Sequence, residues 1–232
     1  MTAPATDPSA APSTERTQTV VTLDMEGVLV PEIWIAVAER TGIAALRRTT
    51  REEPEHGLTL ALIQDVIAGL EPLPGAADFV AELRERTQVV ILSDTFEQFA
   101  APLMRQLGMP TILCHRLVVE SDRITDYRIR IDDPKRRAVQ AFQGLNYRVI
   151  AAGDSYNDTT MLLAADAGFL FHSPANVQAE FPNLKHVLVA GEPAAGQLAL
   201  SRLPAAPAPV AGPRPADVST MLESREKSLP TT

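Results

Sequence analysis

The chain has 232 residues, of which 45% are hydrophobic and 22% are charged, as in an ordinary soluble globular protein. This length suffices for one α/β domain with appendages, and because the net charge is -8 with no basic stripe, no nucleic-acid partner is expected. The sequence contains no apolar stretch that could span a bilayer and no signal-peptide-like N-terminus, so no membrane association is expected.

The two ends of the chain differ in composition from its middle. Residues 1–17 are rich in Pro, Ala, Ser and Thr, and residues 204–232 are rich in Pro and Ala; neither end shows apolar periodicity. We therefore predict two disordered tails around a folded body of residues 18–203. The body contains no internal repeat.

The first half of the body alternates strand and helix signals. In chain order they predict strand Thr19–Leu23, helices Glu32–Thr41, Leu58–Leu70 and Ala76–Glu85, strand Val89–Leu92 and helix Phe96–Leu107. Gly42 and Gly108 follow helices, where glycine often ends them. The four consecutive apolar residues of Val89–Leu92 are typical of a strand that is covered on both faces.

The second half continues the alternation around an edge hairpin. It predicts strand Thr111–Cys114, hairpin strands Leu117–Val119 and Ile124–Ile131, helix Pro134–Phe142, strand Val149–Ala152, helix Asp158–Ala165, and strands Phe169–Phe171 and Val187–Val189. Alternating strands and helices favour an α/β fold with a central parallel sheet and right-handed crossovers. The hairpin is expected at the edge of that sheet.

Two carboxylates follow the first predicted strand. Asp24 and Glu26 stand two residues apart in an extended turn, so their side chains are expected to face the same way. One carboxylate can attack phosphorus, and the other can protonate the departing alkoxide and later deprotonate the attacking water or alcohol. Taken alone, the segment also fits a simple polar turn.

A second carboxylate segment, Gly153-Asp-Ser-Tyr-Asn-Asp158, follows strand Val149–Ala152. Phosphoryl transfer needs a hard cation, and Mg²⁺ takes oxygen ligands. We predict Asp24, Asp154 and the backbone carbonyl of Glu26 as its ligands, with Asp158 fixing a neighbour's charge. A run of helix N-caps is the alternative, and it leaves the other segments unexplained.

Ser93 and Lys135 are the remaining candidates for phosphate binding. The Ser93 hydroxyl and the backbone N–H groups of the turn that follows offer hydrogen-bond donors, and Lys135 offers a positive charge. As alternatives, Ser93 fits a helix N-cap, and Lys135 fits a solvated basic face shared with Arg136 and Arg137.

Several other side chains that could carry chemistry are interpreted as structural. The single cysteine, Cys114, lies in an apolar run and is predicted to be a buried free thiol. One cysteine excludes a disulfide framework and fits a reducing cytoplasm. Trp34 is predicted to pack between core and cap. The histidines show no metal-ligand spacing, and each is interpreted as structural. They are His56, His115, His172 and His186.

Together these segments resemble the haloacid dehalogenase superfamily of phosphotransferases. The resemblance is closest to the phosphoserine phosphatase-like branch whose members also act as homoserine phosphotransferases, and it covers about residues 19–190. It rests on the order and spacing of the stretches 23–35, 89–96, 102–108, 133–136 and 148–161. It implies a Rossmann-like parallel sheet with a small helical (C1-type) cap inserted after the first strand, at about residues 36–72.

The resemblance also implies a role for each matching position. Asp24 resembles the nucleophile that becomes phosphorylated, and Glu26 resembles the general acid/base. The positions that resemble the family's Mg²⁺ ligands are Asp24, the backbone carbonyl of Glu26 and Asp154. Glu32 resembles the carboxylate that binds the substrate amino group. The other positions that resemble phosphate and substrate contacts are Ser93, Asp94, Lys135 and Asn157.

The cap departs from the family pattern. Between Thr50 and Leu58 the chain has seven residues, Arg51–Gly57, where family members carry a longer helical stretch with an arginine for the substrate carboxylate. Arg47, Arg48 or Arg51 could substitute. A shorter lid excludes water less well, which favours hydrolysis over transfer to an alcohol. It also leaves apolar surface around Trp34 and Leu58–Leu62 that a homodimer could cover.

These observations predict a Mg²⁺-dependent phosphatase that acts on O-phospho-L-serine, with possible transfer of phosphate to homoserine. Two alternatives remain open. The shortened cap could leave a broad phosphatase of small phosphomonoesters, or the chain could be a phosphate-binding or scaffold protein without turnover.

Overall fold

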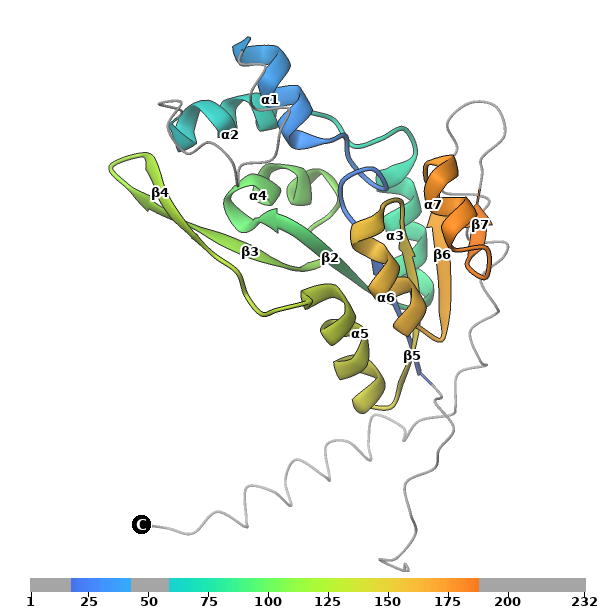
Figure 1. The fold of residues 1–232 in the computed structure, drawn as a ribbon. Coiled ribbons are helices and arrows are strands. Elements are labelled where there is room, and N and C mark those ends of the chain that lie inside the picture. The colour runs from blue at the N-terminus through green and yellow to red at the C-terminus, as the bar shows by residue number, and fades with distance from the viewer. Residues whose placement is uncertain (1–17, 43–58, 188–232) are drawn as a thin grey trace, which may run out of the picture.

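A seven-stranded sheet forms the centre of the fold in a computed structural model that describes residues 18–42 and 59–187. Its strands are β1 Gln18–Leu23, β2 Gln88–Phe96, β3 Thr111–Glu120, β4 Arg123–Arg128, β5 Tyr147–Gly153, β6 Ala167–Phe171 and β7 Lys185–Val187. They lie in the order β4-β3-β2-β1-β5-β6-β7, and every neighbouring pair is parallel except β3 and β4 (Figure 1). The predicted α/β fold with an antiparallel hairpin at the sheet edge is confirmed.

Helices cover both faces of the sheet. They are α1 Ile33–Thr41, α2 Leu60–Ala68, α3 Ala76–Arg86, α4 Glu97–Gln106, α5 Pro134–Gly144, η2 Tyr156–Asp158 (a 3-10 helix), α6 Thr159–Ala164 and α7 Ala175–Glu180. One apolar core joins α1 to α4 with Val21 and Leu23 of β1, and a second joins α5, α6 and α7 with Val20. Residues alternate between the two faces of a strand, so β1 is buried from both sides.

Some elements differ from those predicted. β3 is continuous from Thr111 to Glu120, because His115 and Leu117 point inward and Arg116 points to solvent, as in a half-buried strand. β2 extends to Phe96, which pairs with His115 after a register shift. Helix α7 was not predicted, since it has only six residues and one of them is buried. Cys114 is a free thiol as predicted, but it is only half-buried.

Part of what the sequence predicted lies outside the described residues. This applies to the two tails, to residues 188–203 and to cap residues 43–58, which include Arg47, Arg48 and Arg51. Within the described part of the chain, none of the helices has the length and hydrophobicity needed to cross a membrane.

The order of the strands creates a topological switch point between the central strands β1 and β5. From β1 the chain adds β2, β3 and β4 on one side, and then returns to place β5, β6 and β7 on the other. In open α/β sheets, ligands bind beyond the carboxyl ends of the strands at such a point. The functional site is therefore expected where β1 and β5 end.

The cap helices are joined to the rest of the fold at several points. α1 and α2 lie together above α4 in Figure 1, and the Trp34 ring of α1 meets Phe99 of α4 edge-on with 5.2 Å between centroids. Gln64 of α2 donates to the carbonyl of Gln98 at 3.0 Å. Trp34 therefore packs between cap and core, as predicted.

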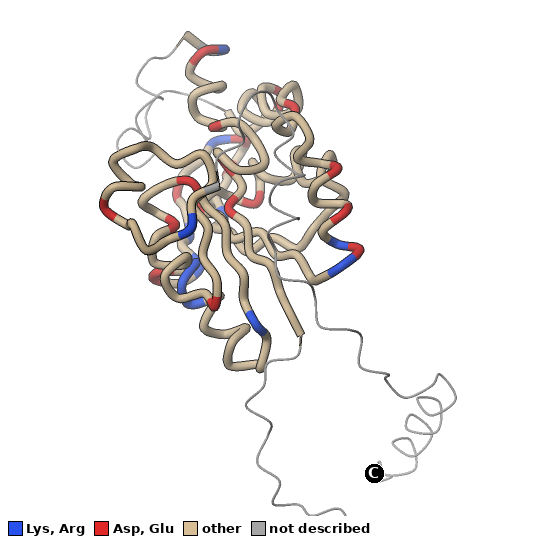
Figure 2. Tube along the Cα trace, turned by 90° about the vertical axis from the view of Figure 1, so that its right-hand side faces the viewer, with Lys and Arg blue, Asp and Glu red and all other residues tan. Residues whose placement is uncertain are grey.

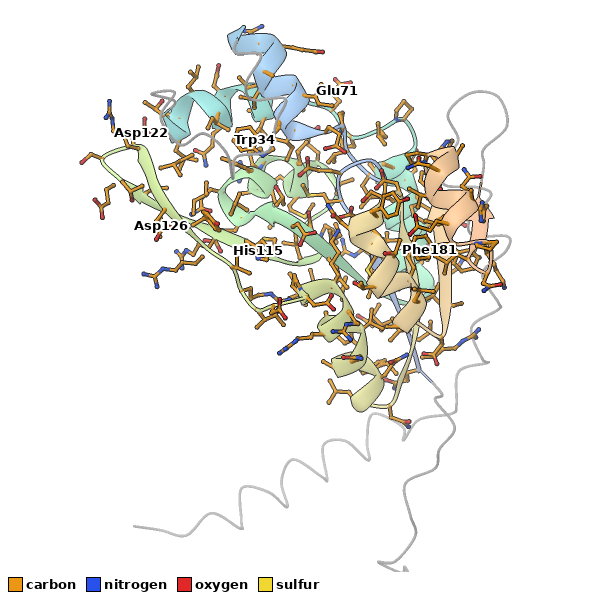
Figure 3. The ribbon with its side chains drawn as sticks, in the orientation of Figure 1. Trp34, Glu71, His115, Asp122, Asp126 and Phe181 are labelled. Atoms are coloured by element: carbon orange, nitrogen blue, oxygen red, sulfur yellow. The ribbon has the colours of Figure 1, made fainter. Side chains whose placement is uncertain are left out.

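The tip of the β3–β4 hairpin caps the first turn of α2 (Figure 3). Leu60 N–H donates to the carbonyl of Asp122 and Ala61 N–H donates to its carboxylate Oδ1, each at 2.9 Å. Leu62 N–H donates to the hydroxyl of Thr59, the N-cap residue, at 3.2 Å. Three amides that a helix start leaves without an intrahelical partner are thus satisfied, two of them by the hairpin.

We expect Asp122→Ala to lower the free energy of unfolding by about 1–2 kcal/mol, because it removes a cap acceptor and places alanine at a φ of 64°. Asp122→Asn is the matched control, since it keeps an acceptor oxygen and tolerates that backbone conformation. Urea unfolding should show a lower midpoint for the alanine variant alone. Equal midpoints for both variants and the wild type would contradict this clamp.

Candidate active site

Adjacent strand ends bring the predicted residues together. Leu23 of β1 pairs with Ala152 of β5, and Asp24 N–H continues the ladder by donating to the Ala152 carbonyl at 2.9 Å. Asp24 therefore starts beside Gly153 and Asp154. On the other side β1 pairs with β2, which carries Ser93 two residues beyond Ile91, the partner of Leu23. Three neighbouring parallel strands thus end at one site.

A tight turn after β1 returns Glu26 toward this site. Leu29 N–H and Val30 N–H both donate to the Met25 carbonyl, at 2.9 and 3.0 Å. Gly27 has a φ of +76°, and a Cβ there would overlap the Asp154 carboxylate, so glycine is needed for two reasons. Glu26 Oε2 accepts the N–H of Ile33, the first residue of α1, at 2.9 Å.

Lys135 lies at the centre of a buried ion network. Lys135 is only 4% exposed. Its ammonium lies 2.7 Å from Asp158 Oδ1, 3.0 Å from Asp24 Oδ1 and 3.5 Å from Asp94 Oδ2. Burial alone would lower the pKa of Lys135, but the facing carboxylates of Asp24 and Asp158 outweigh it and hold that pKa above its usual value. Lys135 is therefore charged at neutral pH, and the interpretation as a solvated basic face is wrong.

The Asp158 carboxylate is fully buried and holds the second carboxylate segment in place. Its Oδ2 accepts the N–H of Asp154 at 2.9 Å and the N–H and hydroxyl of Ser155 at 3.0 and 3.2 Å, while its Oδ1 faces Lys135. The loop also forms a capping box between Ser155 and Asp158. These contacts engage both oxygens of Asp158, so it fixes the loop and pairs with Lys135.

Burial raises the pKa of three carboxyl groups at the site. It raises that of Asp24 well above the usual range, against the opposing effect of Lys135. Burial, with the nearby charges of Asp158 and Glu32, raises the pKa of Asp154 to about 6. Burial raises the pKa of Glu26 to about 7, although the Ile33 N–H acts in the opposite direction. Negative charge is thus concentrated where water is scarce, a frequent property of functional sites.

Carboxylate oxygens of Asp24, Asp154 and Asp158 lie within 4.8 Å of one another. This all-oxygen donor set fits a hard divalent cation such as Mg²⁺. A cation would oppose the burial and the nearby negative charge that raise the pKa of Asp24 and Asp154. Asp24 and Asp154 are the better candidates for direct ligands, because both oxygens of Asp158 already accept hydrogen bonds.

The other predicted contacts surround this centre unevenly. The Ser93 hydroxyl is buried and accepts Thr95 N–H at 3.2 Å. Glu32 is exposed just before α1, and its charge acts on Glu26 and Asp154, so it faces the same site. Asp94 lies beside Lys135, as described above. Asn157 is exposed in η2, next to the carboxylate loop.

Sequence reasoning missed two residues at the site. Thr95 is 7% exposed and its side chain hydrogen-bonds to Glu26, and its place directly after Ser93 and Asp94 could have indicated this. His115 was interpreted as structural, but its Nε2 lies 3.6 Å from Asp94 Oδ1. No local signal links His115 to that carboxylate, because the contact depends on the β2–β3 register.

Comparison with known proteins adds a family and two relatives. Residues 19–166 match the family model described as haloacid dehalogenase-like hydrolase. The chain is 61% identical to a phosphoserine phosphatase from Pseudomonas syringae pv. tomato, over 72% of this chain and 77% of that protein. It is 60% identical to phosphoserine phosphatase ThrH from Pseudomonas aeruginosa, over 72% of this chain and 89% of that protein.

The fold is similar to that of a solved structure, and the chain is shorter than its Pseudomonas relatives within the region that they share. The crystal structure of a phosphoserine phosphatase in apo form has a TM-score of 0.61 at 19% identity, over 70% of this chain and 90% of that one, which concerns the fold alone. Each Pseudomonas alignment spans 183 residues but includes 72% of this chain, about 167 of its 232 residues. This chain is thus about 16 residues shorter across the matched region.

Proposed function

The chain belongs to the haloacid dehalogenase-like hydrolase family, and on that premise we propose that it hydrolyses O-phospho-L-serine through a phosphorylated Asp24. One observation carries the proposal. Lys135 joins Asp24 and Asp158 in a buried network, with Asp154 beside them, at the ends of β1 and β5. This arrangement suits phosphoryl transfer, which depends on positioning and on neutralising the charge of the phosphoryl oxygens.

Asp24 is the proposed nucleophile. Met25 N–H, at 2.7 Å, and the Lys135 ammonium both lie on its Oδ1, so we assign the attack to Oδ2. The new bond joins Oδ2 to phosphorus, and the bond from phosphorus to the seryl oxygen breaks. Lys135 opposes the rise in the pKa of Asp24 that burial causes, and it balances charge on the acyl phosphate.

Glu26 is the proposed proton carrier. It gives a proton to the departing seryl alkoxide and then takes one from the water that attacks phosphorus, which releases phosphate and restores Asp24. A pKa of about 7 leaves both protonation states populated near neutral pH, as these two tasks require. The Ile33 N–H and the Thr95 side chain orient its carboxyl group.

Glu26→Gln is expected to slow hydrolysis of the phosphorylated enzyme by roughly 10²- to 10⁴-fold, because the amide cannot deprotonate water. Formation of the phosphorylated enzyme should be slowed less. Rapid-quench experiments should then show the phosphorylated form accumulating. Glu85→Gln, an exposed position on α3, is the control. If breakdown of the phosphoenzyme proceeds at the wild-type rate in Glu26→Gln, another group activates the water.

Mg²⁺ is the proposed cofactor, held by Asp24, Asp154 and the carbonyl of Glu26. When bound, it supplies charge neutralisation for the phosphoryl oxygens. Asp158 acts on this site through the loop, because its hydrogen bonds to Asp154 and Ser155 fix the position of the Asp154 backbone. Burial of Asp24 and Asp158 strengthens these electrostatic interactions, because the effective dielectric constant is lower there than in water.

We expect the affinity for Mg²⁺ to fall as the pH drops through about 6. Asp154 binds a proton below its pKa of about 6, and the cation must displace that proton. Calorimetric titration of the metal-free protein with Mg²⁺ between pH 5 and 8 should show this loss, and Asp154→Asn should show weak binding throughout. Affinity that stays constant from pH 8 to pH 5 would contradict Asp154 as a ligand.

Substrate selection is assigned to groups around the metal centre. Glu32 faces the site from the start of α1 and is the proposed partner of the substrate amino group. Ser93, Asp94 and Asn157 are the proposed contacts to phosphate and substrate. Phosphoserine is proposed because two relatives at 60–61% identity are phosphoserine phosphatases, and the name ThrH motivates homoserine as an alternative phosphate acceptor.

The extent of the cap bears on selectivity. We take residues 18–203 as one phosphatase domain with a cap insertion at about 36–72, shortened between Thr50 and Leu58. The shorter matched region supports this. It also favours a second candidate, a broad phosphatase of small phosphomonoesters, because a short cap contacts less of the substrate and admits more water.

The test is phosphate release with Mg²⁺ from O-phospho-L-serine and from a panel of other small phosphomonoesters, with and without homoserine. A kcat/KM for phosphoserine at least tenfold above the rest of the panel supports the first candidate. Similar, low values across the panel support the second. Phosphohomoserine formed when homoserine is added would establish the transfer.

We further propose a cytoplasmic homodimer whose contact includes the exposed apolar face of the cap. Ile35 of α1 is 46% exposed and Leu62 of α2 is 44% exposed. Trp34, part of the surface predicted for this contact, instead packs on the core. Light scattering at micromolar concentration tests the dimer, and a monomer there would rule it out at that concentration.

A further inference from the structure

His115 joins three segments that approach the active site. It belongs to β3, is 7% exposed, and pairs in register with Phe96 of β2. Its Nδ1 accepts the N–H of Arg130, in the connection from β4 to α5, at 3.2 Å. Its Nε2 lies 3.6 Å from Asp94 Oδ1 in β2. Figure 3 shows the imidazole in the middle of β3, away from the hairpin tip.

The contact with Arg130 decides which ring nitrogen carries the proton. A nitrogen that accepts a hydrogen bond has no proton of its own, so in the neutral ring the proton is on Nε2. This N–H faces Asp94 Oδ1. Burial and the fixed backbone on both sides leave the ring little freedom to turn. In this tautomer the ring atom nearest Asp94 Oδ1 is a donor, at 3.6 Å, which is slightly longer than a direct hydrogen bond.

Asp94 needs such support more than the other two acids that lie next to the Lys135 ammonium. Its side chain is 44% exposed, whereas those of Asp24 and Asp158 are 9% and 0% exposed. Its Oδ2 is 3.5 Å from the Lys135 ammonium. An exposed side chain samples several rotamers unless its polar atoms are held, and here His115 and Lys135 each face one oxygen.

We propose that His115 is a positioning residue whose Nε2–H orients Asp94 toward Lys135 and the substrate. The proposal rests on the proposed function of the site, in which Asp94 contacts substrate. Orientation matters because small displacements of a contacting group reduce reactivity steeply. Loss of His115 should therefore act through Asp94 and have little effect when Asp94 has already been changed.

Two substitutions separate the two ring nitrogens. His115→Asn keeps an acceptor near the Nδ1 position for Arg130 N–H and removes the donor to Asp94. His115→Gln keeps a donor near the Nε2 position and removes the acceptor. We expect His115→Asn to lower kcat/KM for O-phospho-L-serine roughly 10- to 100-fold, and His115→Gln to retain activity within about threefold.

A double-mutant cycle with Asp94→Asn tests whether the effect passes through Asp94. If it does, adding His115→Asn to Asp94→Asn should change kcat/KM by no more than about twofold. Independent, multiplying losses in the double variant would overturn the proposal, as would equal losses in His115→Asn and His115→Gln accompanied by equal drops in thermal midpoint. Those results would describe a merely structural histidine.

Nitrogen NMR of the imidazole gives a readout that needs no substrate. We expect the ring of His115 to be protonated on Nε2, and Asp94→Asn to shift the Nε2 resonance far more than that of Nδ1. An unshifted Nε2 resonance would overturn the proposal even in an active enzyme. A shifted one in an enzyme inactive on all substrates would support the contact and count against the proposed function instead.

Discussion

Asp24→Asn is expected to reduce phosphate release at least roughly 10⁴-fold, the largest loss of any single change in this chain. The amide cannot attack phosphorus, so no covalent intermediate forms. The fold should persist, because the variant removes one negative charge from a cluster whose burial already raises the pKa of Asp24. Lys135 keeps Asp158 and Asp94 as partners.

Asp126→Asn provides the matched control for this change. Asp126 is exposed on β4, away from the strand ends that carry the site, and is labelled in Figure 3. The control should release phosphate at the wild-type rate and unfold at the same urea concentration. An Asp24→Asn enzyme that retains more than about a tenth of wild-type turnover would contradict Asp24 as nucleophile.

Lys135→Met should both inactivate and destabilise the protein. Removing the ammonium leaves Asp24 and Asp158 buried without their cation, and breaking a buried pair in this way costs about 3–5 kcal/mol. The pKa of Asp24 should then rise further, since Lys135 opposes the rise that burial causes. We expect a fall in kcat/KM of roughly 10³-fold, from loss of the ionised nucleophile and of the phosphate-binding charge.

The pH dependence of this destabilisation has a definite sign. Without Lys135 the pKa of Asp24 rises further, so the folded state binds more protons than the unfolded state. Stability then increases as the pH falls. The midpoint difference from wild type in urea should be larger at pH 8 than at pH 5, and Lys185→Met, an exposed position on β7, should show little difference at either pH. A difference that grows toward pH 5 would contradict the network.

The acidic side chains at the site outnumber the positive charge that Lys135 supplies. Around the Lys135 ammonium the described residues place Asp24, Asp94, Asp154 and Asp158, with Glu26 and Glu32 close by. Figure 2 shows lysine and arginine spread over several elements of the described chain. A phosphate dianion entering this cluster needs further positive charge, which the proposed Mg²⁺ supplies.

The sequence allowed the centre of the site to be predicted because strand position and chemistry coincide there. Apolar runs that end at Leu23 and Ala152 predict buried strands. Carboxylates that follow these runs are then expected at the carboxyl ends of the parallel strands. Parallel pairing of β1 with β5 then brings Asp24 and Asp154 together. Lys135 has no such local signal, and its choice over a solvated basic face depended on the other three segments of the site.

Contacts set by register or by long-range packing could not be predicted. Whether His115 meets Asp94 depends on the register shift between Leu92 and Phe96, which a sequence pattern does not encode. The strands predicted separately at Thr111–Cys114 and Leu117–Val119 are one strand, in which His115 points inward and Arg116 points outward. The hairpin clamp on α2 likewise joins Asp122 to residues about 60 positions earlier.

The most direct test of this account is to find where the phosphoryl group goes. The enzyme with Mg²⁺ is mixed with O-phospho-L-serine, quenched in acid within milliseconds, digested and examined by mass spectrometry, with Asp24→Asn and Asp126→Asn treated alike. We expect a phosphoryl group on the peptide that contains Asp24 in the wild type and in Asp126→Asn, and none on that peptide in Asp24→Asn. Phosphate release without label on that peptide, or label on the same peptide in Asp24→Asn, would contradict it.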